Sequence, residues 1–98
     1  MFEVRQTDEF AEWLASLTDA RAKAKVLTRI ERLADGNPGD VEPVGDGVSE
    51  LRIHYGPGYR VYYQQRGTTL VLLLIGGDKS SQKRDIAKAK KLASEYET

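Results

Sequence analysis

The sequence contains no cysteine and a single histidine, His54. It therefore has no disulfide framework and no thiolate nucleophile, and one chain cannot supply a metal site made of several histidines. The longest apolar run, residues 70–75, is too short to cross a bilayer, and residues 1–8 mix charged with apolar side chains, unlike a signal peptide. These absences favour a cytoplasmic protein without membrane attachment, and no motif indicates a metal or a cofactor.

The chain also lacks net charge, because its 15 basic and 15 acidic residues cancel. Residues 1–49 hold six basic and ten acidic side chains, a net of −4, whereas residues 50–98 hold nine basic and five acidic ones, a net of +4. This asymmetry permits a basic working surface, although a chance imbalance among solvated side chains explains it equally well. The length of 98 residues and the 40% hydrophobic content predict one globular domain over residues 1–98.

Hydrophobic spacing in the first half predicts one strand and two helices. Residues 2–6 alternate apolar and polar side chains, as a strand does. Thr7 can cap a helix behind it, and a second helix restarts at Thr18-Asp19. We expect these helices to form an antiparallel hairpin, followed by a loop over residues 36–47, which are rich in glycine, proline and acidic side chains.

The second half predicts an antiparallel meander. Residues 48–55 and 59–65 alternate around a turn at residues 56–58. Residues 70–75 are apolar at every position, which predicts a central strand buried on both faces and broken by residues 76–78. With a final helix, the order is β-α-α-β-β-β-α, an α+β domain with a helical hairpin packed on a small antiparallel sheet.

The predicted turn brings chemically interesting side chains together. A turn loop of three residues, 56–58, places His54 opposite Arg60. It also places Arg52 opposite Tyr62. Strand alternation then puts all four side chains on one face of the sheet, with the apolar neighbours facing the helical hairpin.

These residue types suit cleavage of an RNA phosphodiester. Arginine offers a fork of donors for phosphate, histidine titrates near neutrality, and tyrosine can stack on a base. Structural alternatives remain open: His54 as a polar residue of the wet face, Arg52 as a partner of Glu50, Arg60 as an anchor for another acid, and Tyr62 as a packing residue.

Ser80 or Ser81 can cap a final helix, which is predicted to run to about Tyr96. The basic residues of this segment are Lys79, Lys83, Arg84, Lys88, Lys90 and Lys91. Their charge can attract a polyanion, and Lys83, Arg84 and Lys88 are the candidate RNA contacts. The alternative is the solvated face of an ordinary amphipathic helix.

Two long motif blocks resemble a known family. Residues 50–53 (ELRI) and 55–63 (YGPGYRVYY) resemble the central hairpin of HigB-like proteins, often described as addiction-module killer proteins. Residues 72–86 (LLLIGGDKSSQKRDI) resemble the last strand and helix start of the same family, and the N-terminal elements fit as well. The chain is thus similar over essentially its whole length to the HigB-like branch of the RelE/ParE toxin superfamily.

The resemblance implies the toxin of a type II toxin–antitoxin system. Its partner would be an antitoxin, commonly a small helix-turn-helix DNA-binding protein, with which it can form a hetero-oligomer. RelE-like and HigB-like toxins typically act as endoribonucleases that cleave mRNA at the ribosome without a metal, and so inhibit translation and arrest growth. In them the ribose 2′-hydroxyl attacks the adjacent phosphate, and basic side chains replace the usual histidine pair.

The resemblance also implies site residues. Arg60 falls on the strand position where such toxins often place a phosphate-contacting arginine, and Arg52 and Lys79 are its expected companions. His54 and Tyr59 are added from the face argument and the motif, and Tyr62 is added as an RNA contact.

Two other functions remain open. ParE-like relatives share this fold but inhibit DNA gyrase and are not nucleases, and a chain that has lost toxicity would be an antitoxin-binding module. The neutral net charge also departs from the strongly basic character of many ribosome-dependent toxins.

Overall fold

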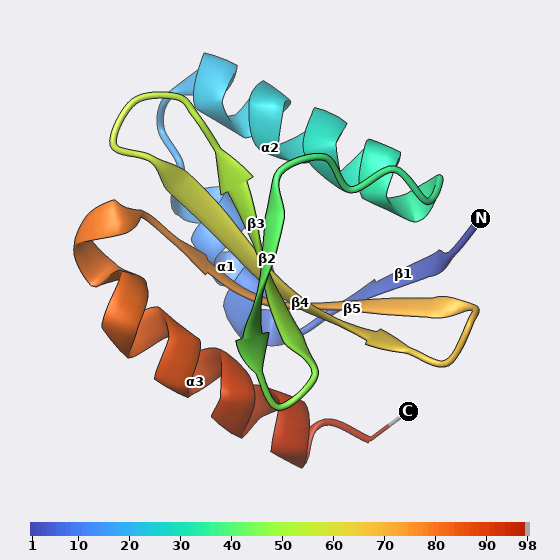
Figure 1. Cartoon of the computed structure of the whole chain (residues 1–98). Coiled ribbons are helices and arrows are strands. Elements are labelled where there is room, and N and C mark those ends of the chain that lie inside the picture. Colours follow the sequence, from blue (N-terminus) through green and yellow to red (C-terminus); the bar gives the residue numbers. More distant parts are fainter. Residues whose placement is uncertain (98) are drawn as a thin grey trace.

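The computed structural model describes residues 1–97, which fold into a five-stranded sheet with helices on both faces (Figure 1). The elements in chain order are β1 (Glu3–Gln6), α1 (Asp8–Ser16), α2 (Ala20–Ala34), β2 (Val41–Gly45), β3 (Val48–Ile53), β4 (Tyr59–Arg66), β5 (Leu70–Gly77), the 3₁₀ helix η1 (Lys79–Ser81) and α3 (Gln82–Glu95). The predicted α+β class, with two helices before the sheet and one after it, is confirmed.

The strand order is β1-β5-β4-β3-β2, with β1 parallel to β5 and the other neighbours antiparallel. As predicted, β5 lies inside the sheet and is buried on both faces. It does not break at residue 76 but continues through Gly77. Both glycines are needed for packing, because a Cβ on Gly76 would overlap the Trp13 ring and one on Gly77 would overlap the Asp85 carboxylate.

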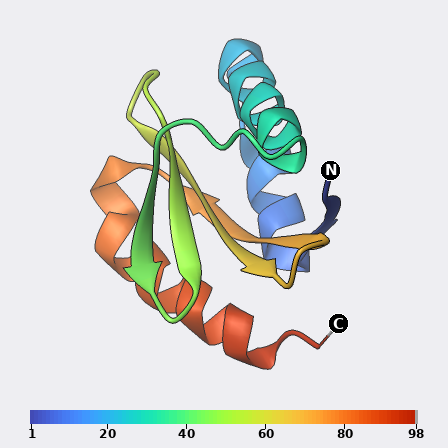
Figure 2. The same ribbon diagram turned by 45° about the vertical axis from the view of Figure 1, so that its right-hand side comes forward.

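The sheet separates two hydrophobic clusters. One lies beneath α1 and α2, where Phe10 and Val26 pack on odd-numbered strand residues such as Leu51 and Val61. The other lies beneath α3, around Tyr62 and two leucines of β5. Figures 1 and 2 show α3 on one side of the sheet and the two N-terminal helices on the other. Across residues 1–97 no helix has the length and apolarity needed to span a bilayer.

The predicted cap at Thr7 is confirmed, and the second helix restarts at Asp19 as expected. The Thr7 hydroxyl accepts a hydrogen bond from Phe10 N at 2.9 Å and donates one to Leu74 O at 2.6 Å, so it joins α1 to β5. The Asp19 carboxylate accepts from the first turn of α2. At α3, Ser81 occupies the capping position but its hydroxyl bonds to Asp85, so the predicted serine cap is absent.

The predicted loop over residues 36–47 is wrong in its second part. Residues 41–45 form β2, which pairs Val41 with Leu51 and Pro43 with Ser49. The register shifts between Pro43 and Gly45. Proline and an irregularity of this kind are tolerated at the edge of a sheet, and β2 is an edge strand.

The predicted pairing of the central hairpin is wrong by two residues. Ile53 pairs with Tyr59 and Arg52 pairs with Arg60, so the connecting loop spans residues 54–58. Two turns form inside this loop. Tyr55 N donates a hydrogen bond to Ile53 O, and Gly58 N donates one to Tyr55 O, so residue 54 is not part of the strand ladder. A shift of two keeps strand parity, so the predicted faces of β3 and β4 are right.

Candidate functional site

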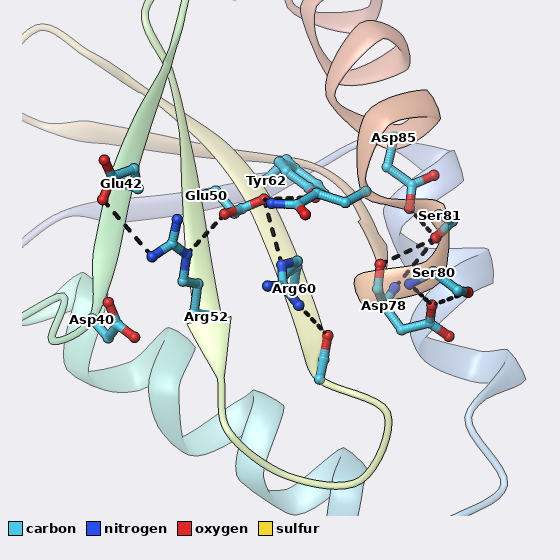
Figure 3. A network of polar contacts seen from close by, with 12 residues as sticks. Asp40, Glu42, Glu50, Arg52, Arg60, Tyr62, Asp78, Ser80, Ser81 and Asp85 are labelled. Carbon is cyan, nitrogen blue, oxygen red and sulfur yellow. Dashed lines mark hydrogen bonds and ion pairs between the residues drawn. The ribbon is translucent and has the colours of Figure 1, made fainter.

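A buried carboxylate organises the sheet face beneath α3. Glu50 of β3 is fully buried and accepts hydrogen bonds from Arg52 Nε at 2.9 Å, Tyr62 Oη at 2.9 Å and Gln82 Nε2 at 2.8 Å (Figure 3). These donors come from β3, β4 and the start of α3. The Glu50 side chain therefore ties three elements together at one point.

Glu50 is held in its ionised form. Burial acts to raise the pKa of the Glu50 carboxyl, but the hydrogen bonds from Arg52, Gln82 and Tyr62 and the charge of Arg60 outweigh it, so the pKa lies below its usual value. Burial and the bond to Glu50 both raise the pKa of the Tyr62 phenol, which keeps its proton and donates. Burying a charge is costly unless the charge is paired and hydrogen-bonded, and Glu50 has such partners.

The Arg60 guanidinium lies beside the same carboxylate. Its Nε lies 3.5 Å from Glu50 Oε2 without a hydrogen-bond partner, and its Nη1 donates to Gly58 O at 2.7 Å. The side chain is 13% exposed. The backbone of Gly58 separates it from Lys79, since a Cβ at Gly58 would lie 3.1 Å from Arg60 Nη1 and 3.4 Å from Lys79 Cβ. The exposed lysine and the arginine therefore flank the hairpin turn together.

Arg52 completes the basic group on the outer side. Its side chain is 32% exposed, and its Nη1 lies 3.8 Å from Glu42 Oε2 in β2. Directly opposed like charges destabilise a strand pair, yet Arg52 and Arg60 are cross-strand partners. Glu50 compensates both. We name Arg52, Arg60 and Lys79 the arginine site; two guanidinium groups held in fixed positions suit binding of a phosphate.

The junction between β5 and α3 fixes Lys79 in its place. Asp78 accepts hydrogen bonds from Ser80 N at 2.8 Å and from the Ser80 hydroxyl, which lowers the pKa of the Asp78 carboxyl. Lys79 N donates to Pro57 O at 3.4 Å, and Ser81 bonds to Asp85. Figure 3 shows this cluster beside Arg60.

His54 does not join the arginine site. It is 76% exposed and pairs with Asp40, which precedes β2, and this bond holds the pKa of the Asp40 carboxyl below its usual range. His54 also lies in a hollow along α2, on the other side of the sheet from Glu50. The predicted grouping of His54 with Arg52 and Arg60 is therefore wrong, because residue 54 has left the strand ladder.

The two predicted tyrosines are also not free to contact a ligand at the arginine site. Tyr59 packs edge-on against Trp13, with ring centroids 6.4 Å apart, on the α1 side of the sheet. Tyr62 is 0% exposed, so the predicted stacking on a base is wrong. The three predicted contacts on α3 are exposed: Lys83, Arg84 and Lys88.

Sequence reasoning treated Glu50 only as a surface partner of Arg52 and missed Gln82. The available signal was the position of Glu50 between the apolar residues Val48 and Leu51, in a strand that lies between β4 and the edge strand β2. Within residues 1–97, no three side chains of the histidine, aspartate or glutamate type gather as a metal ion requires.

Comparison with known proteins gives two matches. The family model described as Phage derived protein Gp49-like (DUF891) matches residues 12–96, which include every residue of the arginine site. A curated relative from Haemophilus influenzae is 52% identical over 93 residues, which cover 95% of this chain and 94% of the relative. That relative is named only as an uncharacterized protein.

Proposed function

Since this chain belongs to the phage-derived Gp49-like family, a toxin-like family of addiction-module killer proteins, we propose that it is the toxin of a toxin–antitoxin pair and that it cleaves RNA. In this proposal it is a HigB-like member of the RelE/ParE superfamily. It cleaves mRNA at the ribosome in the cytoplasm, and a helix-turn-helix antitoxin neutralises it. The observation that carries the proposal is the pair Arg52 and Arg60, held together by buried Glu50 beside Lys79.

The proposed reaction is a transesterification. The ribose 2′-oxygen forms a bond to phosphorus, the bond from phosphorus to the 5′-oxygen breaks, and the products are a 2′,3′-cyclic phosphate and a 5′-hydroxyl end. Arg52 and Arg60 stabilise the charge that develops on the non-bridging oxygens. Lys79 is exposed beside the turn and can protonate the leaving 5′-oxygen, while water accepts the 2′-hydroxyl proton.

Buried Glu50 is a positioning residue in this scheme. It is 0% exposed, so it orients the two guanidinium groups and does not touch the substrate. Its negative charge offsets part of their repulsion before the substrate binds, and the incoming phosphate compensates the rest.

The test is induction of the protein in cells followed by mapping of transcript ends. The proposal expects new mRNA ends within minutes of growth arrest. Growth arrest with intact mRNA and blocked supercoiling would instead indicate a ParE-like gyrase inhibitor. Harmless overexpression without an antitoxin would indicate a module that has lost toxicity.

The substitution His54→Gln is expected to leave RNA cleavage within about threefold of wild type. The imidazole is bound to Asp40 and lies on the α2 side, away from the arginine site. The cleavage rates of the two purified proteins on the same mRNA, at saturating concentration in a translating extract, check this. A loss of about a hundredfold or more in a folded protein would show that His54 acts as an acid or base.

A further inference from the structure

A second basic surface lies along α2. An open hollow there is lined by Arg21, Lys25, Arg29 and Arg32 together with His54, and none of its lining residues within the described chain is acidic. We call it the α2 hollow. Asp40 lies at its edge, where its carboxylate pairs with His54 and its backbone carbonyl accepts a hydrogen bond from Arg29. The four lysine and arginine residues of this hollow all belong to residues 1–49, although this half of the chain has a net charge of −4.

Arg29 has a structural role in this hollow. Its guanidinium donates to Arg52 O at 2.6 Å, Pro38 O at 3.0 Å and Asp40 O at 3.2 Å. These bonds join α2 to the end of β3 and to the segment before β2. Arg29 therefore contributes fixed positive charge, and its removal would disturb the fold.

The other three cations are exposed: Arg21, Lys25 and Arg32. Among residues 1–97 no acidic side chain forms an ion pair with any of them, and the nearest aromatic contact is Lys25 Nζ, 5.3 Å from the Tyr55 ring centroid. Their donors therefore remain available to a ligand.

The placement of these cations does not favour folding. The first turn of α2 contains no acidic residue and carries Arg21, although the positive end of a helix dipole disfavours cations. Lys25 follows Arg21 at a spacing of four, where like charges repel. In contrast, the first turn of α1 contains Asp8 and Glu9. The capping carboxylate of Asp19 offsets part of this cost for Arg21, and the Tyr55 ring does so for Lys25.

We propose that the α2 hollow binds the phosphate backbone of RNA as a second contact surface, separate from the arginine site. Four of its eight lining residues are lysine or arginine, and none of the eight is acidic; Ala24 and Ile53 are the apolar ones. Protein–protein interface cores are depleted of charge, whereas protein–nucleic acid interfaces are strongly positive. The hollow contains no free aromatic ring, so it contacts phosphates without discriminating bases.

The proposal rests on the proposed function in naming RNA as the ligand, but binding does not require cleavage. The probe is a fluorescent single-stranded RNA with 2′-O-methyl groups at every ribose, which removes the attacking hydroxyl. Its affinity is measured by anisotropy between about 50 and 200 mM salt. The test variant is Arg21→Gln/Lys25→Gln. The control variant is Arg5→Gln/Lys23→Gln, which removes the same charge outside the hollow.

The test variant is expected to bind roughly tenfold more weakly at the lowest salt, with a salt slope shallower by about 1.4, which is about 0.7 for each lost phosphate contact. The control is expected to stay within about twofold of wild type. The melting temperature of the control variant should be unchanged. That of the test variant should be unchanged or slightly raised.

Equal losses in both variants, or none in either, would overturn the proposal. A glutamate-rich peptide that binds the hollow more tightly than the RNA would also overturn it, in favour of an acidic protein partner. Cleavage of unmodified mRNA is assayed separately in a translating extract. Intact binding with no cleavage would contradict the role of the arginine site and leave the hollow as described.

Discussion

Replacing Arg60 by lysine is expected to reduce RNA cleavage by about a hundredfold to a thousandfold in a protein that still folds. Lysine retains the charge but lacks the planar fork that can bind two phosphate oxygens. It also lacks the Nη1 that donates to Gly58 O, so its ammonium is not held at the same position. The measurement is the rate at which purified protein cleaves mRNA in a translating extract, with circular dichroism to confirm folding.

The matched control for this change is Arg66→Lys in the same strand. Arg66 donates to Tyr96 O and Ala93 O, at 2.7 Å each, and so has a structural role at the other end of β4. Its replacement should lower the melting temperature while leaving cleavage by the folded fraction close to wild type. Wild-type cleavage by Arg60→Lys would remove Arg60 from the site.

Replacing Glu50 by alanine is expected to lower the free energy of unfolding by about 3–5 kcal/mol, which is the usual cost of removing one partner from a buried ion pair. Arg52 and Arg60 would face each other without the carboxylate, and the donors of Tyr62 and Gln82 would lose their acceptor. Since small domains are stable by about 5–15 kcal/mol, this change removes a large share of the folding free energy. Urea denaturation measures the change.

The variant Glu50→Gln separates charge from shape. It keeps the size and one acceptor oxygen, so we expect a loss of about 1–3 kcal/mol. Arg52 and Arg60 should then be less well positioned, and cleavage by the folded fraction should fall. A stability equal to wild type in both Glu50 variants would contradict the central role given to this carboxylate.

The pH dependence of stability provides a second measurement on Glu50. Its folded-state pKa lies below the ordinary value of 4.5, so its contribution is fully present above that value and is lost as the pH falls through the lower folded value. As the pH is lowered from neutral into the acid range, the free energy of unfolding of Glu50→Gln should therefore fall less than that of wild type. Parallel curves for the two proteins would contradict an ionised, paired Glu50.

Local sequence signals were enough to predict most of the fold. The cap at Thr7, the helix restart at Asp19 and the apolar run of β5 each depend on neighbouring residues alone, and each is confirmed. Strand β2 was missed because its proline and the glycines in and around it indicate a loop unless the neighbouring strand is known. An edge strand is defined by its partner, and the local sequence does not contain that information.

The site was only partly predictable, because some of its features depend on local spacing and others on distant elements. Parity alone put Arg52 and Arg60 on one face, and a pairing error of two residues did not change that. The positions of His54 and Tyr62 depended on the turn and on how far α3 covers the sheet, which no short spacing reveals. Glu50 was underestimated because a carboxylate is usually exposed, and only the converging donors from two other elements explain its burial.

The most direct test of the account is the chemistry of the ends that the purified protein makes on mRNA in a translating extract. Transesterification at the arginine site predicts upstream fragments that end in a 2′,3′-cyclic phosphate and downstream fragments that begin with a 5′-hydroxyl, absent from the Arg60→Lys reaction. Intact mRNA under conditions in which the same protein arrests growth, or 5′-phosphate ends, would contradict it.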